Sequence, residues 1–186
     1  IKIRPHFSLI KLNRSNLTVN LAKRQRLDLG SVGKGYAIDL AYKALIEFPA
    51  FMINAGGDIR VKGPKPDGKE WEIGLQKTQV PNRALVENQL IGRPNLKEGS
   101  ICGSGGWARR VRFFHHLLNP KTGMPINSIS QTFTYAKTAM EADAWATILF
   151  TLGVDGLSLL EKGKIQGVVV DNDGSISFTG DIFSNM

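Results

Sequence analysis

The segment LDLGSVGKGYAIDL, residues 27–40, joins a glycine-rich turn to an amphipathic helical pattern. Over residues 34–48 apolar side chains recur at the three- and four-residue spacing of a helix, and Pro49 ends the run. The turn is not a nucleotide-binding P-loop, because too few residues precede its Gly-Lys pair and Gly35 follows Lys34 where Ser or Thr is required. The segment therefore predicts a turn and a helix, and leaves open what the turn holds.

Strand patterns occupy most of the remaining chain. Residues 7–22 alternate apolar and polar side chains around the turn cluster NRSN, which predicts a β-hairpin. The other strands that we expect lie at residues 26–29, 51–54, 59–62, 70–76, 84–91, 111–118, 131–137 and 167–171. A helix over 139–152, a shorter helix over 156–162 and a terminal hairpin that turns at DNDG complete the order. This order favours an α+β fold, with mixed or antiparallel sheets and packed helices, over a doubly wound parallel sheet.

The helix expected at 139–152 carries the clearest chemical signal. Thr138 and Glu141 form a capping-box pattern that fixes its first turn. Asp143 and Thr147 are four residues apart, so both lie on one face, and two hard oxygen donors on one helix suit Mg²⁺. Spacing alone favours the alternative in which Thr147 bonds back to a carbonyl oxygen one turn earlier and Asp143 faces solvent.

Two loop motifs offer further candidates. NAGGD, residues 54–58, places two glycines between strands, which suits a tight turn or the close approach of a backbone to a flat ligand. HHLLNPKTGMP, residues 115–125, begins with two histidines that face opposite ways on a strand, so at most one serves a site. Histidine is suited to proton transfer near neutral pH, although a surface histidine is the commoner interpretation.

The charge of the chain is unevenly distributed. Its 186 residues carry a formal net charge of +8, and residues 1–34 hold eight Lys and Arg against the single acidic residue Asp28. A nucleic-acid surface, an anionic membrane face and a rim for a phosphorylated ligand are all compatible with this excess, but a solvated basic hairpin is favoured over each. Because no nucleic-acid-binding motif is visible, no nucleic-acid partner is expected. The only cysteine, Cys102, excludes an internal disulfide and a cysteine-based metal site.

Taken together, the motifs resemble one family. In chain order they are LDLGSVGKGYAID, NAGGDI, SGGW, HHLLNPKTGMP and EADAWATILFTLG. From about residue 8 to the end they resemble the ApbE family, the FAD:protein FMN transferases. The resemblance implies an ApbE-like α+β fold and one ApbE-like domain over residues 1–186.

The resemblance also implies an activity. An enzyme of this kind uses Mg²⁺ to split the pyrophosphate of its substrate FAD, transfers FMN to a Thr or Ser hydroxyl of a target redox protein, and releases AMP. Asp143 and Thr147 would hold Mg²⁺ with the backbone carbonyl of Ser31, and His116 would be the functional histidine and candidate base. The residues expected to contact FAD are Asp28, Lys34, Asn54, Gly56, Gly57 and the backbone at Leu118.

Two motifs depart from the family pattern. Asn119 replaces an Asp, and GSGGW at 103–107 has Gly103, Gly106 and Trp107 at substituted positions. We also expect the chain to lack the family's N-terminal portion, which helps to enclose the flavin and the adenine. These departures motivate the alternative of an FAD-binding module with little or no transfer activity.

A third hypothesis is a binder of nucleic acid or of a membrane surface that acts through residues 1–34. Family members often act outside the cytoplasm, so the resemblance suggests the periplasm or cell envelope. An N-terminal anchor missing from this sequence would then provide membrane association.

Overall fold

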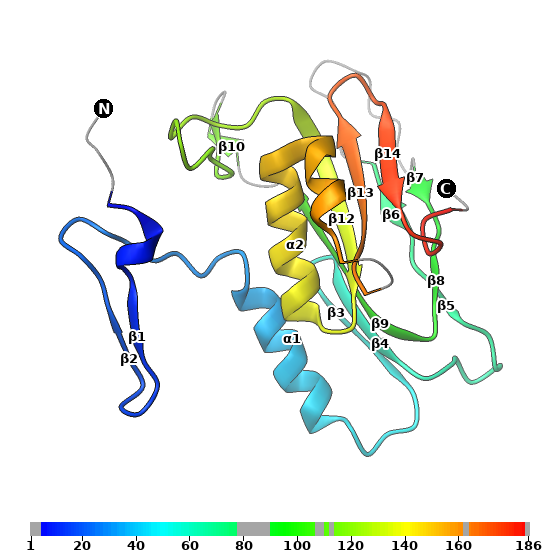
Figure 1. The fold of residues 1–186 in the computed structure, drawn as a ribbon. Helices are drawn as coiled ribbons and strands as arrows, with labels where there is room; N and C mark the ends of the chain where they lie inside the picture. The colour runs from blue at the N-terminus through cyan, green and yellow to red at the C-terminus, as the bar shows by residue number, and fades with distance from the viewer. Residues whose placement is uncertain (1–4, 78–89, 107–109, 112–113, 162–163, 185–186) are drawn as a thin grey trace. The chain divides into compact units, whose positions relative to one another are not determined.

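The computed structural model describes residues 5–77, 90–106, 110–111, 114–161 and 164–184. The chain divides into two compact units, Ile1–Gly30 and Ser31–Met186, which are treated separately below. Figure 1 shows the elements of each unit. Within the described residues, no helix combines the length and the apolar character needed to cross a membrane.

The first unit contains a short hairpin. A 3-10 turn over Phe7–Leu9 precedes β1 (Lys11–Asn13), which pairs antiparallel with β2 (Thr18–Asn20). The predicted hairpin is therefore present, but its strands are much shorter than residues 7–22, and the strand expected at 26–29 is absent. None of the described side chains of this unit is buried, and Leu17 is 90% exposed.

The second unit is built on a six-stranded sheet. Its order is β14-β13-β12-β9-β4-β3, and every neighbouring pair is antiparallel. The strands are β3 (Phe51–Ala55), β4 (Asp58–Lys62), β9 (Glu98–Gly105), β12 (Ile129–Ala136), β13 (Gln166–Asp171) and β14 (Ile176–Thr179). Antiparallel strands with packed helices agree with the α+β class expected from the sequence.

Helices and small strands complete the unit. Helix α1 (Gly33–Ala44) packs on β3, β4 and α2 (Ala139–Leu152), and α2 lies along β9 and β12 (Figure 1). A 3-10 segment, η2 (Gly153–Leu159), follows α2. The short strands are β5 (Trp71–Glu72), β6 (Leu75–Gln76), β7 (Leu90–Gly92), β8 (Asn95–Leu96), β10 (Arg110–Val111) and β11 (Phe114–His115). Ile73, Leu75 and Leu96 pack with Val61 and Val168 in a second apolar cluster, so strands β5 to β8 help to bury the sheet.

Several expected elements need correction. Helix α1 ends at Ala44 rather than at residue 48, and the helix expected at 156–162 is the 3-10 segment η2. The strand expected at 70–76 is two short strands, and the one expected at 111–118 is the pair β10 and β11. Most of the strand expected at 84–91 lies outside the described residues.

The most consequential omission was β9, a central strand that pairs with both β4 and β12. Its sequence, EGSICGSG, is rich in small residues and lacks the alternation of a half-exposed strand. Small residues fit here because large neighbours occupy the space: a Cβ on Gly103 would lie 3.0 Å from the Phe133 ring. Periodicity alone therefore does not identify this strand.

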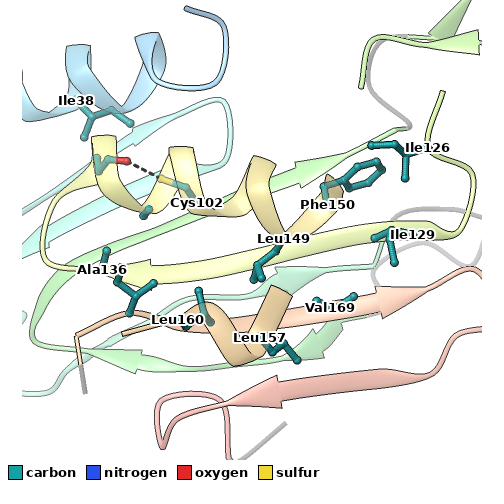
Figure 2. Packing of buried hydrophobic residues seen from close by; sticks show 13 residues of the cluster. Ile38, Cys102, Ile126, Ile129, Ala136, Leu149, Phe150, Leu157, Leu160 and Val169 are labelled. Atoms are coloured by element: carbon teal, nitrogen blue, oxygen red, sulfur yellow. Dashed lines mark hydrogen bonds between the residues drawn. The ribbon is translucent and has the colours of Figure 1, made fainter. Parts of the chain in front are cut away.

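Cys102 lies in the main apolar core, between β9 and α2. Its sulfur is fully buried, donates to the Ala139 carbonyl oxygen at 3.5 Å and lies 3.7 Å from the Ser100 hydroxyl oxygen. Figure 2 shows this bond and the apolar side chains around it. Burial, reinforced by the charge of Asp58, raises the pKa of the Cys102 thiol. Cys102 is thus a small residue packed in the core.

We expect Cys102 to resist alkylation in the native protein. Reaction requires the thiolate form and access of the reagent to the sulfur. Burial disfavours the thiolate and blocks that access. At pH 8, iodoacetamide should modify the native chain at least ~100-fold more slowly than the same chain in urea, because modification must await opening of the core. Equal rates in the two conditions, measured by intact mass, would contradict this packing.

Candidate functional site

Asp143 lies in the second turn of α2 and points into the protein. It is 2% exposed; its Oδ2 accepts the backbone N–H of Gly35 at 3.0 Å, and its Oδ1 lies 3.7 Å from Nζ of Lys34. The alternative in which Asp143 faces solvent is therefore wrong. Burial raises the pKa of this carboxyl, and the Gly35 bond and the Lys34 charge offset that effect only in part.

Gly35 explains how the two helices approach so closely. A Cβ at this position would lie 2.5 Å from Cα of Met140, against the backbone of the first turn of α2. Only glycine leaves the space that lets the N–H of Gly35 reach Asp143. The glycine after the lysine, which separates this turn from a P-loop, thus has a packing role between α1 and α2.

Lys34 is held by a second buried carboxylate. Its Nζ forms an ion pair with Oδ2 of Asp58 at the start of β4, and Oδ1 of Asp58 accepts the backbone N–H of Gly103 at 3.2 Å. Burial lowers the pKa of Lys34, but the bond with Asp58 and the charges of Asp58 and Asp143 outweigh it, so the net shift is upward. Lys34 therefore carries its positive charge between two carboxylates.

Asp58 was missed as a candidate because NAGGD was judged by its glycines. It is 2% exposed, whereas Asn54 of the same motif is exposed. No local sequence signal marks it, because its burial depends on pairing with Lys34, which is 24 residues away along the chain. Asn54 accepts the N–H of Gly57 at 3.0 Å.

The glycine pair forms the tight turn between β3 and β4. Gly56 and Gly57 have φ values of 64° and 97°, and Ala55 pairs with Asp58 across the loop. Two positive φ angles at the centre of a two-residue loop are the conformation that Gly-Gly favours. Contact of this turn with a flat ligand stays a prediction.

Thr147 completes the group around Asp143. Its Oγ1 lies 3.2 Å from Oγ of Ser104 on β9 and donates to the backbone oxygen of Asp143 at 3.4 Å. The back-bond expected from spacing is therefore present, and the hydroxyl is also directed to the β9 side of the helix. Ser31 lies in the turn before α1, two residues ahead of Gly33.

These residues fit a hard divalent cation. Among the ion pairs of the described residues, Lys34 is the only cation bonded to Asp58 or Asp143, so the cluster has one more negative charge than positive. No group of three or more His, Cys, Asp or Glu side chains suited to a metal occurs in the described part of the chain. Mg²⁺ needs few protein ligands and prefers oxygen, so one carboxylate with a hydroxyl and a carbonyl is an adequate donor set.

The two histidines differ in exposure, but β11 ends at His115, so His116 lies just after the strand rather than on its opposite face. His115 is 6% exposed; its Nε2 donates to the Ile126 carbonyl oxygen at 2.9 Å, while Nδ1 accepts the N–H of Leu117 at 3.2 Å. His116 is exposed and makes an interaction of its own. His115 is therefore structural, and His116 remains the candidate for proton transfer.

The loop after the histidines is closed by side-chain and backbone bonds. Leu118 forms a bridge with Pro125, and Oδ1 of Asn119 accepts the N–H groups of Lys121 and Thr122 at 2.9 and 3.3 Å. An Asp would offer the same acceptor oxygen, so the departure at Asn119 leaves this turn intact. The exposed Leu118 and His116 lie at the start of the loop.

The departure at Gly106 has a direct structural counterpart. A Cβ there would lie 2.8 Å from Cδ2 of the buried His115 ring. We expect Gly106→Ala to lower the free energy of unfolding by about 1–3 kcal/mol through overpacking. Thermal denaturation should show that Gly106→Ala lowers stability only slightly when His115 has already been replaced by Ala. An equal loss of stability with and without His115 would contradict this contact.

Asp28 belongs to the first unit. Its Oδ1 accepts the N–H of Gly30 at 2.7 Å, which closes a small turn. Its contact with FAD stays a prediction. The structure thus joins Lys34, Asp143 and Thr147 in one cluster, while Asn54 lies near the end of β3 and His116 lies in the loop that follows β11.

Comparisons with known proteins place the chain in a family. The ApbE family model matches residues 2–169. An FAD:protein FMN transferase of Haemophilus influenzae is 34% identical over 164 residues, which cover 82% of this chain and 46% of the relative. One from Klebsiella pneumoniae is 32% identical, covering 81% of this chain and 47% of the relative. The chain thus spans about half the length of the curated relatives it matches.

Solved structures agree with the fold. A crystal structure of an ApbE protein from Thermotoga maritima matches with a TM-score of 0.79 at 27% identity. The match covers 92% of this chain and 57% of the Thermotoga maritima chain. The flavin transferase ApbE from Vibrio cholerae matches with a TM-score of 0.77 at 23% identity. This match covers 97% of this chain and 59% of the Vibrio cholerae chain. The α+β architecture and the match over most of the sequence lead to one conclusion: the chain belongs to the ApbE family.

Proposed function

We propose that this chain carries the metal- and pyrophosphate-binding part of a flavin transferase. The reaction would move FMN from FAD to a Thr or Ser hydroxyl of an acceptor redox protein and release AMP. The names of its relatives support FAD as the substrate and a protein as the acceptor. The acceptor hydroxyl, the metal and the AMP product belong to this proposal.

One observation supports the proposal most strongly. Asp143 and Asp58 are both buried, and they share only the ammonium of Lys34 among the ion pairs of the described residues. Burying a carboxylate without full compensation is costly, so a protein retains such a group where a cation ligand repays the cost. The excess negative charge beside the Thr147 hydroxyl therefore favours a divalent cation at this place.

The residues have distinct tasks. Asp143, Thr147 and the backbone carbonyl of Ser31 would hold Mg²⁺, which when bound neutralises charge on the pyrophosphate oxygens as the P–O bond to AMP breaks. Lys34, released from its pairing with Asp143, would bind the diphosphate as a second cation. Asp58 keeps the ammonium charged and directed to this region.

Proton removal from the acceptor hydroxyl is assigned to His116. Its exposed position lets a protein substrate approach, which the buried His115 does not permit. In-line attack on the phosphorus requires the hydroxyl to be held close while its proton is taken. The turn at Asn54, Gly56 and Gly57 and the backbone at Leu118 would contact the flavin nucleotide, as would Asp28.

The test is a transfer assay with the chain itself. FAD, Mg²⁺ and an acceptor protein with a Thr flavinylation site should give an acceptor that stays fluorescent on a denaturing gel and an equal amount of AMP by chromatography. Chelation of Mg²⁺ should stop both. Bound FAD without AMP under any divalent metal would instead support the FAD-binding module, and absence of flavin binding would reject both.

Two matched variants locate the metal within this assay. Thr147→Val removes the candidate ligand, whereas Thr151→Val removes a hydroxyl one turn later that donates to the Thr147 carbonyl at 2.9 Å. We expect the Mg²⁺ concentration for half-maximal transfer to rise roughly 10–100-fold in the first variant and to stay unchanged in the second. Equal effects of the two would count against Thr147 as a ligand.

A further inference from the structure

Two ion pairs of opposite polarity join α1 to β4. Lys34 pairs with Asp58, and Asp39, five residues later on α1, pairs through Oδ1 with Nη1 of Arg60, two residues later on β4. Five helical residues advance about 7.5 Å and two strand residues about 6.6 Å, so both pairs form in one register. Any shift of α1 along β4 would separate both pairs.

Arg60 makes this pairing stringent. The residue is 9% exposed, and its guanidinium carbon lies 3.7 Å from the centroid of the Tyr42 ring. Its Nε is buried without a hydrogen-bond partner, so Asp39 supplies the compensating negative charge. Removing one partner of a buried pair leaves an uncompensated charge, which is much more costly than losing an exposed pair.

The same Asp39 carboxylate also reaches α2. Its Oδ1 accepts the N–H of Ala139 at 2.8 Å and its Oδ2 accepts the N–H of Met140 at 3.0 Å. These donors belong to the first turn of α2, where N–H groups have no partner within the helix and the helix dipole is positive. One carboxylate on α1 therefore ties α1 to both β4 and α2.

The bonds between the two helices lie one turn apart. Asp39 on α1 meets Ala139 on α2, and Gly35 on α1 meets Asp143 on α2. The first contact therefore fixes where the second occurs. A cap alone does not require Asp39, because Thr138 accepts the N–H of Glu141 at 3.3 Å at the same helix end.

We propose that Asp39 is the positioning residue of this site: it sets the register of α1 on α2 and β4 and so holds the turn at Ser31 and Lys34 against Asp143. The proposal deepens the proposed function, since it rests on the roles assigned above to Ser31, Lys34 and Asp143. Asp39 touches neither metal nor flavin in this account.

The test compares Asp39→Ala with Thr138→Ala. Both variants weaken the N-terminus of α2, but only the first removes the link to α1. In the metal-free protein, amide hydrogen exchange at Gly35 should become at least about tenfold faster in Asp39→Ala and stay within about twofold in Thr138→Ala. Asp39→Asn, which keeps an acceptor oxygen but loses the ion pair, should give an intermediate rate and serves where Asp39→Ala does not fold.

A second readout connects the register to the metal. By calorimetry without flavin, the dissociation constant for Mn²⁺ should rise at least about tenfold in Asp39→Ala or Asp39→Asn relative to Thr138→Ala. The positioning role would be overturned if Asp39→Ala and Thr138→Ala changed the exchange rate at Gly35 and the Mn²⁺ affinity by equal amounts. If the wild-type chain binds no Mn²⁺ while exchange follows the expected pattern, the proposed function fails and the positioning role stands.

Discussion

Asp143→Asn is expected to abolish FMN transfer while leaving the metal-free fold at least as stable as the wild type. The change removes the only carboxylate assigned to the metal. Since a bound metal contributes several kcal/mol to stabilising charge in the transition state, the rate should fall by roughly 1000-fold or more. AMP release and acceptor fluorescence measure the loss.

The stability expected for this variant follows from the direction of the pKa shift. Burial raises the pKa of Asp143 above its ordinary value of 3.8, with the Gly35 bond and the Lys34 charge opposing it. A carboxyl whose pKa is raised in the folded state stabilises the fold at a pH below its unfolded-state pKa. This stabilisation is lost as the pH rises through the folded-state pKa. At pH 7 the ionised group therefore costs free energy, which asparagine avoids while still accepting the N–H of Gly35.

Thermal denaturation without metal checks this separation of function from stability. The melting temperature of Asp143→Asn should equal or exceed that of the wild type, and added Mg²⁺ should raise only the wild-type value. A variant that melts far below the wild type would show that the carboxylate is needed for folding. A variant that keeps full transfer would show that the metal assignment is wrong.

Gly35→Ala is expected to be the most destabilising glycine substitution in α1. The new methyl would lie 2.5 Å from Cα of Met140, and the atoms it meets are backbone atoms that cannot rotate away. Overpacking of this kind costs about 1–3 kcal/mol and sometimes more, which outweighs the gain of up to about 1 kcal/mol in helix propensity. Urea denaturation measures the loss.

Gly33→Ala is the matched control for this substitution. Gly33 is also in the first turn of α1, but a Cβ there meets nothing within 4 Å. The control should be neutral or slightly stabilising, and it should keep transfer activity, whereas Gly35→Ala should lose it because α1 can no longer bring its N–H to Asp143. Similar denaturation midpoints for the two variants would mean that α1 and α2 do not approach as closely as described.

The sequence predicted the elements with strong local signals. Helix α2 begins after Thr138 as the capping pattern indicates, and Gly153 ends it with a positive φ of 67°. The turn at Gly56 and Gly57 was equally local. Strand β9 was missed because its small residues are dictated by neighbours such as Phe133, which are distant in sequence.

The candidate site was only partly visible for the same reason. Asp143 and Thr147 were identified from their spacing on one helix, but their environment was not. Asp58 and Asp39 act through Lys34 and Arg60, which they meet 24 and 21 residues away along the chain. No sequence periodicity predicts these ion pairs, because they form only when α1 packs against β4.

The central claim is best tested by locating the metal itself. Crystals of the chain soaked with Mn²⁺ and FAD should show an anomalous difference peak roughly 2 Å from a carboxylate oxygen of Asp143, within reach of the Thr147 hydroxyl and the Ser31 carbonyl. An anomalous peak at another position, with Lys34 still paired with Asp58 and Asp143, would contradict the proposed metal site.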